Sequence, residues 1–323
     1  MLKSNSSALT LRLPTLKFLV TGGAGFLGSA LANQLAHDGH EVRALDDLSA
    51  GDSDRLAPEV LFTRGDVNDR PKLWSLLQGV ECVYHLAARV SVPESILFPR
   101  EYNAVNVGGT VGVMEAMRDA GVKRVVLTSS GAVYGSQLQQ PLRETLVPNP
   151  DSPYAVSKLS AEAYVRTIGT LWGIETVALR VFNAYGPGQP LPASHPPVVP
   201  RFIKGAVSGA SLVVHGDGQQ SRDYVFVSDV VAALLAAATA RNLDRLVINV
   251  GSGTATTLRQ LVAAVAEVTG ARLEPLYNNN ESGGVREMCA DLTLAGSLLG
   301  YSPKVGLDEG LRRTLAADER FHA

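Results

Sequence analysis

Six short apolar runs alternate with longer segments of helical period over the first 181 residues of the chain. Runs of Val and Leu with few charges, four to six residues long, are typical of strands that a parallel sheet buries on both faces. The predicted strands are Lys17–Thr21, Val42–Asp46, Val60–Arg64, Cys82–His85, Arg124–Thr128 and Thr176–Val181. The predicted helices between them are Gly25–His37, Arg70–Gln78, Arg100–Ala120 and Tyr154–Gly173. This alternation predicts an α/β protein with a doubly wound parallel sheet of the Rossmann type, because right-handed crossovers place helices on both faces.

The pattern changes after Phe182. Six of the 17 prolines fall within residues 186–200, which predicts an irregular loop. Beyond it, the predicted helices are Arg201–Ser208, Val230–Arg241 and Thr257–Thr269, and the predicted strands are Leu212–His215, Tyr224–Val227 and Val247–Val250. We therefore expect a first domain at residues 16–182, with later strands near 224–250 returning to its sheet. A smaller C-terminal α/β domain is expected to contain most of residues 183–323.

Composition excludes several classes of protein. Lys and Arg total 29 against 31 Asp and Glu, so the chain lacks the basic excess that is typical of nucleic-acid binding. The sequence has no apolar run near the roughly 18–20 residues of a membrane-spanning helix, and residues 1–15 lack the apolar block of a secretory signal. Two cysteines, Cys82 and Cys289, fit a reducing compartment, and the six histidines lack metal-ligand spacing. We expect a cytoplasmic globular protein that binds no metal, nucleic acid or membrane.

A glycine-rich turn follows the first predicted strand directly. Gly22, Gly25 and Gly28 have the Gly-x-x-Gly-x-x-Gly spacing and lie between that strand and a predicted helix. In such a turn the first glycine permits the bend, the second lets a pyrophosphate approach the backbone, and the third lets helix and strand pack closely. An ordinary glycine-rich turn can have the same spacing, so the triplet alone is a weak signal. Its position between strand and helix predicts a dinucleotide site.

Two aspartates follow strands beside this turn. Asp46 closes the second predicted strand, 18 residues after Gly28. A carboxylate there can accept hydrogen bonds from the adenosine ribose of NAD and would repel the 2′-phosphate of NADP. The positions after it carry no Lys or Arg until Arg55, which also favours NAD. A plain surface turn is the alternative for Asp46. Asp66 ends the third predicted strand and is a weaker candidate for contact with the adenine amine.

Tyr154 and Lys158 form a Tyr-x-x-x-Lys pair, which places both side chains on one face of a predicted helix. A phenol titrates near pH 10, and a neighbouring ammonium together with the positive nicotinamide of NAD would stabilise its phenolate as a base. Ser129 and Ser130 follow a predicted strand at the edge where such sheets bind ligands, and a hydroxyl there can donate to a substrate oxygen. The alternatives are a solvated helix pair for Tyr154 and Lys158, and a turn or cap role for each serine.

Taken together, these residues resemble the extended short-chain dehydrogenase/reductases, and within them the nucleotide-sugar epimerase/dehydratase family. The matching segments lie in family order from Lys17 to the region of Asp291. They are Thr21-Gly-Gly-Ala-Gly-Phe-Leu-Gly28, His85-Leu86-Ala87-Ala88, Ser129-Ser130-Gly-Ala-Val-Tyr134-Gly135, Tyr154-Ala-Val-Ser-Lys158, Arg180-Val-Phe-Asn183-Ala-Tyr-Gly-Pro187, Gly216-Asp-Gly-Gln-Gln-Ser-Arg222-Asp-Tyr224 and Arg286.

The resemblance implies a role for each matching position. Tyr154 resembles the catalytic base, Lys158 its partner on the nicotinamide ribose, and Ser130 the hydroxyl that binds the sugar oxygen. The implied NAD contacts are Gly22, Gly25, Phe26, Leu27, Gly28, Asp46, Asp66, Val67, Leu86, Ala87, Ala88, Tyr154 and Lys158. The implied contacts with a nucleotide-diphosphate sugar are Ser130, Tyr154, Asn183, Arg222 and Arg286. A planar guanidinium suits the oxygens of a diphosphate. The first domain would thus bind NAD and the second the substrate.

One position selects the reaction within the family. Members similar to 4,6-dehydratases carry an acidic residue two before the Tyr of the Val-Tyr-Gly segment, and some carry an adjacent Asp. This chain has Gly131 and Ala132 there, and neither can act as a general acid or base. What remains resembles an NAD-dependent 4-epimerase of the UDP-glucose and UDP-galactose type, with N-acetyl and uronic forms left open. Tyr154 would remove the C4 hydroxyl proton as hydride passes to NAD, the 4-keto sugar would turn, and hydride would return to the opposite face.

Two other readings remain open on the sequence alone. A reductase of a nucleotide-linked keto sugar would consume NADH or NADPH, and a dinucleotide sensor would keep the fold without the chemistry. Glu281-Ser-Gly-Gly284 departs from the Arg-Pro-Gly-Asp of many epimerases and places an acid where a cation contacts phosphate. Met288 stands where an aromatic or a small residue governs tolerance of an N-acetyl group. The family also implies a homodimer through the predicted helices at residues 100–120 and 154–173.

Overall fold

A computed structural model of the chain describes residues 15–278 and 285–322. Its strands are β1 (Lys17–Thr21), β2 (Glu41–Asp46), β3 (Leu61–Arg64), β4 (Cys82–His85), β5 (Arg124–Ser130), β6 (Glu175–Val181), β7 (Asn183–Tyr185), β8 (Val213–His215), β9 (Ser221–Phe226), β10 (Leu246–Val250), β11 (Ala255–Thr257) and β12 (Leu276–Asn278). Its α-helices are α1 (Phe26–His37), α2 (Arg70–Leu76), α3 (Val92–Leu97), α4 (Pro99–Tyr102), α5 (Gly109–Ala120), α6 (Pro153–Trp172), α7 (Val198–Val207), α8 (Val227–Thr239), α9 (Leu258–Thr269), α10 (Thr293–Leu299) and α11 (Leu307–Ala317). The described part of the chain contains no helix with both the length and the apolar character that a membrane span requires.

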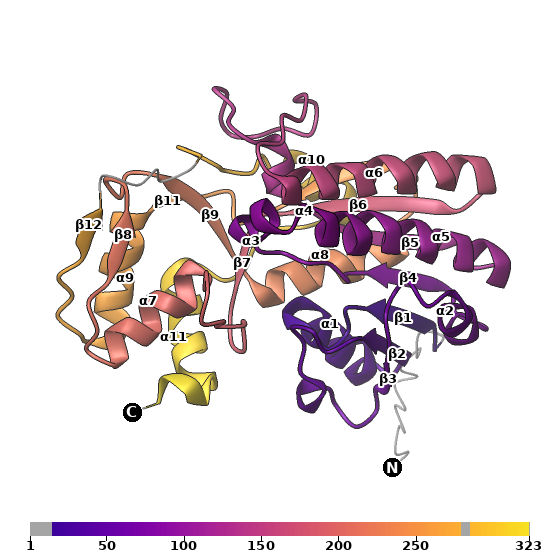
Figure 1. The fold of residues 1–323 in the computed structure, drawn as a ribbon, viewed down its shortest axis with the longest axis horizontal. Coiled ribbons are helices and arrows are strands. Elements are labelled where there is room, and N and C mark those ends of the chain that lie inside the picture. Colours follow the sequence, from indigo (N-terminus) through magenta and orange to yellow (C-terminus); the bar gives the residue numbers. More distant parts are fainter. Residues whose placement is uncertain (1–14, 279–284, 323) are drawn as a thin grey trace, which may run out of the picture.

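Seven parallel strands form the main sheet in the order β10-β6-β5-β4-β1-β2-β3. Figure 1 labels the strands from β6 to β3. The predicted doubly wound sheet is therefore confirmed. The chain winds outward from β1 to β3 and then returns to β4 on the other side of β1. In sheets of this type ligands bind at the carboxyl ends of the strands where the winding reverses, which here are β1 and β4.

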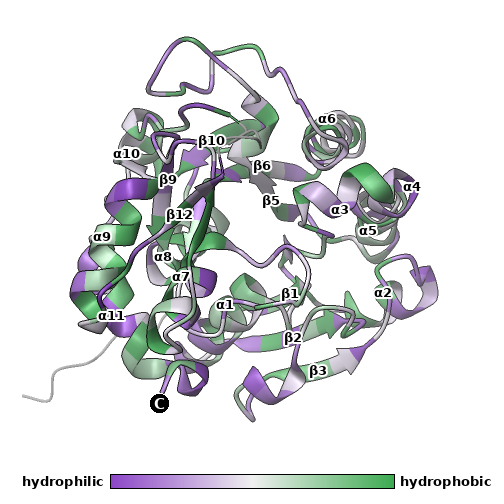
Figure 2. Cartoon of the chain, turned by 60° about the vertical axis from the view of Figure 1, so that its left-hand side comes forward, coloured by the Kyte–Doolittle hydropathy of each residue, from purple (hydrophilic) through white to green (hydrophobic). Residues whose placement is uncertain are grey.

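Helices cover both faces of the main sheet because successive strand residues point to opposite sides. Val20 of β1 packs in one buried cluster with Leu31 of α1 and Leu234 of α8. Leu19, its neighbour in the strand, packs in a second cluster with Val165 of α6. Figure 2 shows α5 and α6 on one side of β5 and β6, with α8 on the other. Two apolar layers thus fix the sheet between its helices and leave the strand ends free to position polar groups.

The strands after β7 join different sheets. β10 joins the main sheet beside β6, as expected for a strand that returns to the first domain. β9 does not return: it pairs with β7 and β11 in a separate three-stranded sheet, and β8 pairs with β12. The expectation that strands near 224–250 return is therefore right for β10 and wrong for β9. Local apolar pattern identifies a buried strand but contains no information about which sheet edge it joins.

The helical segment at residues 99–120 departs from the prediction of one regular helix. It begins with α4, continues through a π-helical stretch, η2 (Asn103–Gly108), and ends with α5. Such π-helical turns inside α-helices are often found at functional sites. A further short helix, α3, was not predicted. Its proline at the second position is compatible with a first turn, and Ser91 caps it by accepting a hydrogen bond from the Glu94 N–H at 3.3 Å.

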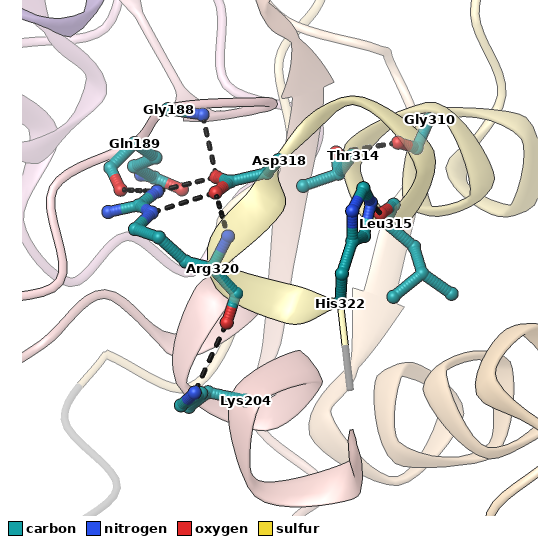
Figure 3. A network of polar contacts seen from close by, with 9 residues as sticks. All are labelled: Gly188, Gln189, Lys204, Gly310, Thr314, Leu315, Asp318, Arg320 and His322. Atoms are coloured by element: carbon teal, nitrogen blue, oxygen red, sulfur yellow. Dashed lines mark hydrogen bonds and ion pairs between the residues drawn. The ribbon is translucent and has the colours of Figure 1, made fainter. Parts of the chain in front are cut away.

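The C-terminal segment fixes the start of the proline-rich loop (Figure 3). A carboxylate oxygen of Asp318 accepts a hydrogen bond from the Gly188 N–H at 2.9 Å. Arg320 pairs with Asp318 and donates to the Gln189 carbonyl at 2.8 Å. Lys204 of α7 in turn donates to the Arg320 carbonyl at 3.1 Å. The loop and the helix that follows it are therefore positioned by residues more than a hundred positions later in the chain.

Candidate active site

The glycine-rich turn connects β1 to α1 at the carboxyl edge of the main sheet. Gly22 has a φ of +69°, and a Cβ there would lie 2.7 Å from the backbone nitrogen of Ala87. A Cβ on Gly28 would overlap the carbonyl oxygen of Gly22, so α1 approaches the turn closely only because residue 28 is glycine, while Gly22 lets the turn approach Ala87. Gly25 precedes the first residue of α1 and caps it without a side chain. The N–H groups of the first helical turn remain directed to the edge, where they favour an anion.

Asp46 lies at the end of β2 and is buried beside the turn. One carboxylate oxygen accepts a hydrogen bond from the Ala24 N–H at 3.0 Å, and the other accepts from the Leu48 N–H at 2.8 Å. Burial raises the pKa of Asp46, and these backbone hydrogen bonds oppose the rise. Asp46 therefore fixes the conformation of the glycine-rich turn, a role that the sequence did not reveal. Each carboxylate oxygen keeps a further lone pair with which to accept from a ribose hydroxyl.

The other residues predicted to contact NAD differ in how they lie relative to this turn. Leu86 and Ala87 follow β4, and their N–H groups donate to the carbonyl and the hydroxyl of Thr21, just before Gly22. Val67 is buried against Gly109 of α5. Asp66 is exposed, and its carboxylate accepts both hydrogen bonds from Asn68. The geometry thus places Leu86 and Ala87 directly beside the turn, whereas contact of Asp66 with the adenine stays a prediction.

His85 connects the turn to the helix layer through buried hydrogen bonds. Its Nδ1 lies 2.7 Å from the Thr21 hydroxyl, and its Nε2 lies 2.9 Å from the Thr110 hydroxyl. Thr110 donates its own proton to the Asn106 carbonyl, so the Thr110 oxygen accepts from Nε2–H and the Thr21 hydroxyl donates to Nδ1. Burial, followed by the charge of Lys158, lowers the pKa of His85 to about 3. The imidazole is therefore neutral, with one fixed tautomer.

Tyr154 and Lys158 lie one turn apart on α6, and both side chains are buried. Ser152 caps the helix by accepting a hydrogen bond from the Ala155 N–H at 3.2 Å, which fixes where the first turn begins. The Tyr154 hydroxyl is hydrogen-bonded with Ser130, at the end of β5. Lys158 lies close enough to His85, at the end of β4, to influence its ionisation. The structure therefore brings the Tyr, the Lys and the Ser together at the carboxyl edge of neighbouring strands.

The protein's own charges do not lower the pKa of the phenol as the sequence led us to expect. Burial raises the pKa of Tyr154, and among the described groups the hydrogen bond with Ser130 is what opposes the rise. Lys158 is itself affected by burial, which lowers its pKa to about 8 against the opposing charge of Glu162. The cost of desolvating a phenolate in this site therefore exceeds the stabilisation that the Ser130 hydrogen bond supplies.

Asn183 and Arg222 lie on paired strands of the three-stranded sheet. Asn183 of β7 is in register with Tyr224 of β9, and Arg222 lies two residues before Tyr224. Side chains two residues apart in a strand share a face, so the amide and the guanidinium lie on one side of this sheet. Arg222 donates to the carbonyls of Ser221 and Val285, both at 2.7 Å. Its ionisation is also influenced by Asp151, just before the start of α6, which places Arg222 near the Tyr154 end of that helix.

Arg201, at the start of α7, was not predicted to be part of the site. Among the described residues, its Nε and the Tyr224 hydroxyl are both buried without a hydrogen-bond partner. Tyr224 influences the ionisation of both Arg201 and Arg222, and burial lowers the pKa of each guanidinium. Arginine stays charged even so, and the two form a positive region beside Asn183. The sequence offered one signal for it, since Arg201 directly follows the proline-rich loop.

Two other predictions on substrate contacts have different outcomes. The Arg286 side chain is 70% exposed and forms an ion pair with Asp217 at 3.1 Å. Arg286 therefore lies at the protein surface, and its contact with substrate stays a prediction. Glu281-Ser-Gly-Gly284, the departure from the epimerase pattern, lies outside the described residues.

A buried ion pair next to the catalytic candidates was also not predicted. Glu162 of α6 and Arg180 of β6 are 3% and 5% exposed in their side chains and form two hydrogen bonds with each other. The Ser129 hydroxyl donates to the same carboxylate at 2.5 Å. Glu162 lies one helical turn beyond Lys158, so the four-residue spacing of Tyr154, Lys158 and Glu162 was the available signal.

The chain matches the model of the NAD dependent epimerase/dehydratase family over residues 18–251. These residues include the glycine-rich turn, Asp46, Ser130 and the Tyr154–Lys158 pair. The structure fits NAD independently of that match. The tight glycine-rich turn, the N-terminus of α1 and the Asp46 carboxylate form the three parts of a dinucleotide site.

Related proteins match nearly the whole chain. The UDP-glucose 4-epimerase of Mycolicibacterium smegmatis is 39% identical over 308 residues, which cover 93% of this chain and 97% of that protein. The crystal structure of UDP-glucose 4-epimerase from Thermotoga maritima with UDP-glucose has a TM-score of 0.90 at 37% identity, covering 94% of this chain and 98% of that one. A UDP-N-acetylglucosamine 4-epimerase from Methanobrevibacter ruminantium, in complex with UDP-N-acetylmuramic acid, has a TM-score of 0.89 at 32% identity with the same coverage.

Proposed function

Because the chain belongs to the NAD-dependent epimerase/dehydratase family, we propose that it interconverts the C4 epimers of a UDP-linked sugar of the glucose and galactose type. The observation that carries this function is the hydrogen bond between Tyr154 and Ser130 at the carboxyl edge of the sheet, next to Lys158. Gly131 and Ala132, which follow Ser130, supply no acid or base. The site can therefore move a proton to and from a hydroxyl but lacks the group that eliminates water.

Gly22, Gly25, Gly28 and Asp46 would hold NAD, with the pyrophosphate at the start of α1 and the ribose at the carboxylate. When bound, NAD supplies the reversible acceptance of two electrons from C4 and a positively charged ring. The buried Asp46 is unfavourable for a 2′-phosphate, which supports NAD over NADP.

Tyr154 is the residue that takes the proton from the C4 hydroxyl and returns it. Ser130 donates to the same sugar oxygen and so keeps it within reach of the phenol. Because burial raises the pKa of Tyr154, removal of the proton requires positive charge close to the phenol oxygen. Lys158 is the nearest cation on α6, and its effect increases in a site from which a bound substrate excludes water.

Asn183, Arg222 and Arg201 would bind the diphosphate of the substrate. Two half-buried guanidinium groups beside an amide suit a group with several anionic oxygens. The unpartnered Nε of Arg201 would then obtain the acceptor that the described protein atoms do not offer it. Met288 is buried with Tyr134 and Phe182 in a separate apolar cluster, and its flexible thioether can adapt to a hydroxyl or an N-acetyl group at C2.

The function is tested by incubating the purified protein, without added cofactor, with UDP-glucose, UDP-galactose and their N-acetyl and uronic forms. We expect NMR to show the C4 epimer of at least one of them, because the reaction returns the electrons it removes and needs no net oxidant. Mass spectrometry of the denatured protein is expected to release NAD. Absence of a C4 epimer with every nucleotide sugar would contradict the proposal, and consumption of added NADH or NADPH with a keto sugar would indicate a reductase instead.

We also propose that the protein forms a homodimer through α6, one of the two helical segments expected from the family, with α3 in place of the segment at residues 100–120. Exposed apolar side chains gather on these helices: Ile96 and Leu97 of α3, and Val156, Tyr164 and Leu171 of α6. The three α6 residues recur at spacings of eight and seven, which places them along one face of the helix. An uncovered stripe of this kind is typical of a protein interface.

Light scattering on the protein as it elutes from a size-exclusion column is expected to give the mass of two chains. Changing Leu97 and Leu171 to Glu should give the mass of one, since charge in the centre of an apolar interface is unfavourable. The control is Leu138→Glu, because Leu138 is fully exposed on a different loop. A single-chain mass for the unaltered protein would exclude the dimer.

A further inference from the structure

The Glu162 carboxylate accepts hydrogen bonds from two neighbouring strands of the main sheet. One carboxylate oxygen accepts from the Ser129 hydroxyl at 2.5 Å and from Arg180 Nε at 2.9 Å. The other accepts from Arg180 Nη2 at 2.8 Å. Ser129 of β5 and Arg180 of β6 are register partners, so the carboxylate bridges both strands at one level. A single side chain of α6 is therefore fixed to the ends of β5 and β6.

This attachment lies directly behind the proposed catalytic residues. Ser129 precedes Ser130, the residue that is hydrogen-bonded with Tyr154. On α6, Tyr154, Lys158 and Glu162 follow one another at intervals of four residues, so they lie along one face of the helix. Because Glu162 is bonded to the strand that carries Ser130, it sets how far α6 can slide or rotate against that serine.

We propose that Glu162 is a positioning residue for the Tyr154–Lys158 pair: its carboxylate fixes α6 against β5 and β6, and its negative charge stabilises the ammonium of Lys158. This inference rests on the proposed function, in which Tyr154 and Lys158 act on the substrate. A buried carboxylate bound to a guanidinium alone would be a stabilising pair with little influence elsewhere. Here the Glu162 carboxylate also lies one turn from Lys158, a buried lysine whose ionisation is influenced by no other acidic side chain of the described chain.

The ionisation of Lys158 supports the second part of the proposal. Burial lowers its pKa to about 8, and Glu162 is the charged group that opposes this change. Arg180 remains protonated, because the hydrogen bonds and charge of Glu162 outweigh its own burial and raise its pKa. Without the Glu162 charge, the effect of burial on Lys158 would be unopposed and would favour loss of its proton.

The titratable groups that surround the Tyr154–Lys158 pair on other elements cannot supply the negative charge that Glu162 supplies. His85 of β4 is neutral, since its pKa is about 3. Tyr102 of α4 lies edge-on to Tyr154, and its hydroxyl donates to Glu94 of α3 at 2.9 Å. Glu94 is in turn paired with Arg89 at 2.9 Å, so its charge is already compensated.

Tyr134, which follows Ser130 in η3 (Gly131–Tyr134), also cannot supply the charge. Arg180 lies over its ring, and its hydroxyl donates to Asn249 at 2.8 Å. Burial raises the pKa of Tyr134, so it is a neutral phenol. Within the described chain, Glu162 is thus the acidic side chain that acts on Lys158.

The test compares Glu162→Gln, Glu162→Asp and the unaltered holoprotein by NMR of side-chain ¹³C-labelled lysine, with the Lys158 signal assigned from Lys158→Arg. We expect the Gln variant to lower the titration midpoint of Lys158 by about one to two units. The alkaline limb of the kcat profile should move to lower pH by the same amount, while NAD content stays constant. The Asp variant keeps the charge and should keep most of the unaltered midpoint. Because the NMR titration needs no turnover, it remains decisive even if the protein proves inactive on every nucleotide sugar.

Two further variants separate this role from a loss of stability. Glu162→Gln combined with Arg180→Met removes both buried charges and is expected to fold, while its Lys158 midpoint still lies below that of the unaltered protein. Glu175→Gln is the matched control, since Glu175 pairs with Arg124 at the opposite end of the same two strands and is 61% exposed. The proposal is overturned if the Lys158 midpoint is unchanged in the double variant, or if Asp and Gln at position 162 have the same effect on the kcat profile.

Discussion

Replacement of Tyr154 by phenylalanine is expected to lower kcat by about 10²–10⁴-fold while the protein keeps its NAD and its fold. The substitution removes the hydroxyl that we propose moves the C4 proton but leaves the ring that packs edge-on against Tyr102. The lost hydrogen bond with Ser130 is expected to cost about 1 kcal/mol of stability, too little to unfold the protein. Initial rates of C4 epimer formation measure the effect, and NAD released on denaturation measures cofactor retention.

Tyr164→Phe provides the matched control for this experiment. Tyr164 lies on the same helix but is 48% exposed, and its change to Phe keeps the aromatic ring on the proposed dimer face. The control variant should keep the rate of the unaltered protein. If Tyr154→Phe kept a rate within threefold of the unaltered protein, another group would have to move the proton.

Replacement of Gly28 by alanine is expected to abolish NAD retention and to lower the free energy of unfolding by about 1–3 kcal/mol. The added Cβ would overlap the carbonyl oxygen of Gly22, which is backbone and cannot rotate away. An alanine inside a helix gains about 1 kcal/mol over glycine, so the observed loss will be smaller than the steric cost alone. Moving α1 away from the turn also displaces the N–H groups that would bind the pyrophosphate.

Gly296→Ala tests whether this effect belongs to the turn. Gly296 is also inside a helix, α10, but a Cβ there would have only an ordinary contact, at 3.7 Å, with the Tyr301 carbonyl. This variant should be as stable as the unaltered protein or slightly more stable, with full NAD content. Thermal unfolding and absorbance of the released nucleotide give both quantities. A Gly28→Ala protein that retained one NAD per chain would show that the close approach of α1 and Gly22 is unnecessary.

The main sheet and the core of the site could be predicted because local patterns determine them. The first six strands follow from apolar runs, and the turn follows from glycines at fixed spacing between a strand and a helix. Tyr154 and Lys158 were found because four-residue spacing on a helix is a local property. The π-helical stretch at 103–108 was not found, since its sequence differs little from that of a regular helix.

The structural role of Asp46, and the residues Glu162 and Arg201 altogether, were missed because their partners are distant in the sequence. The two backbone hydrogen bonds of Asp46 reach the turn 22 residues earlier as well as its own loop. The role of Glu162 can be recognised only in the folded protein, where β5 and β6 bring Ser129 and Arg180 to its carboxylate. Arg201 lies beside Tyr224 and Arg222 because the C-terminal segment positions the loop before it.

By itself, the sequence determined the first six strands of the main sheet, the glycine-rich turn and the groups that we propose move a proton, because each depends on residues a few positions apart. Only the tertiary structure decided the ionisation of those groups. Burial raises the pKa of Tyr154 and lowers that of Lys158, and burial depends on how all the elements pack together. Electrostatic free energies depend on distances in space and on the exclusion of water, and neither is encoded in the spacing of residues along the chain.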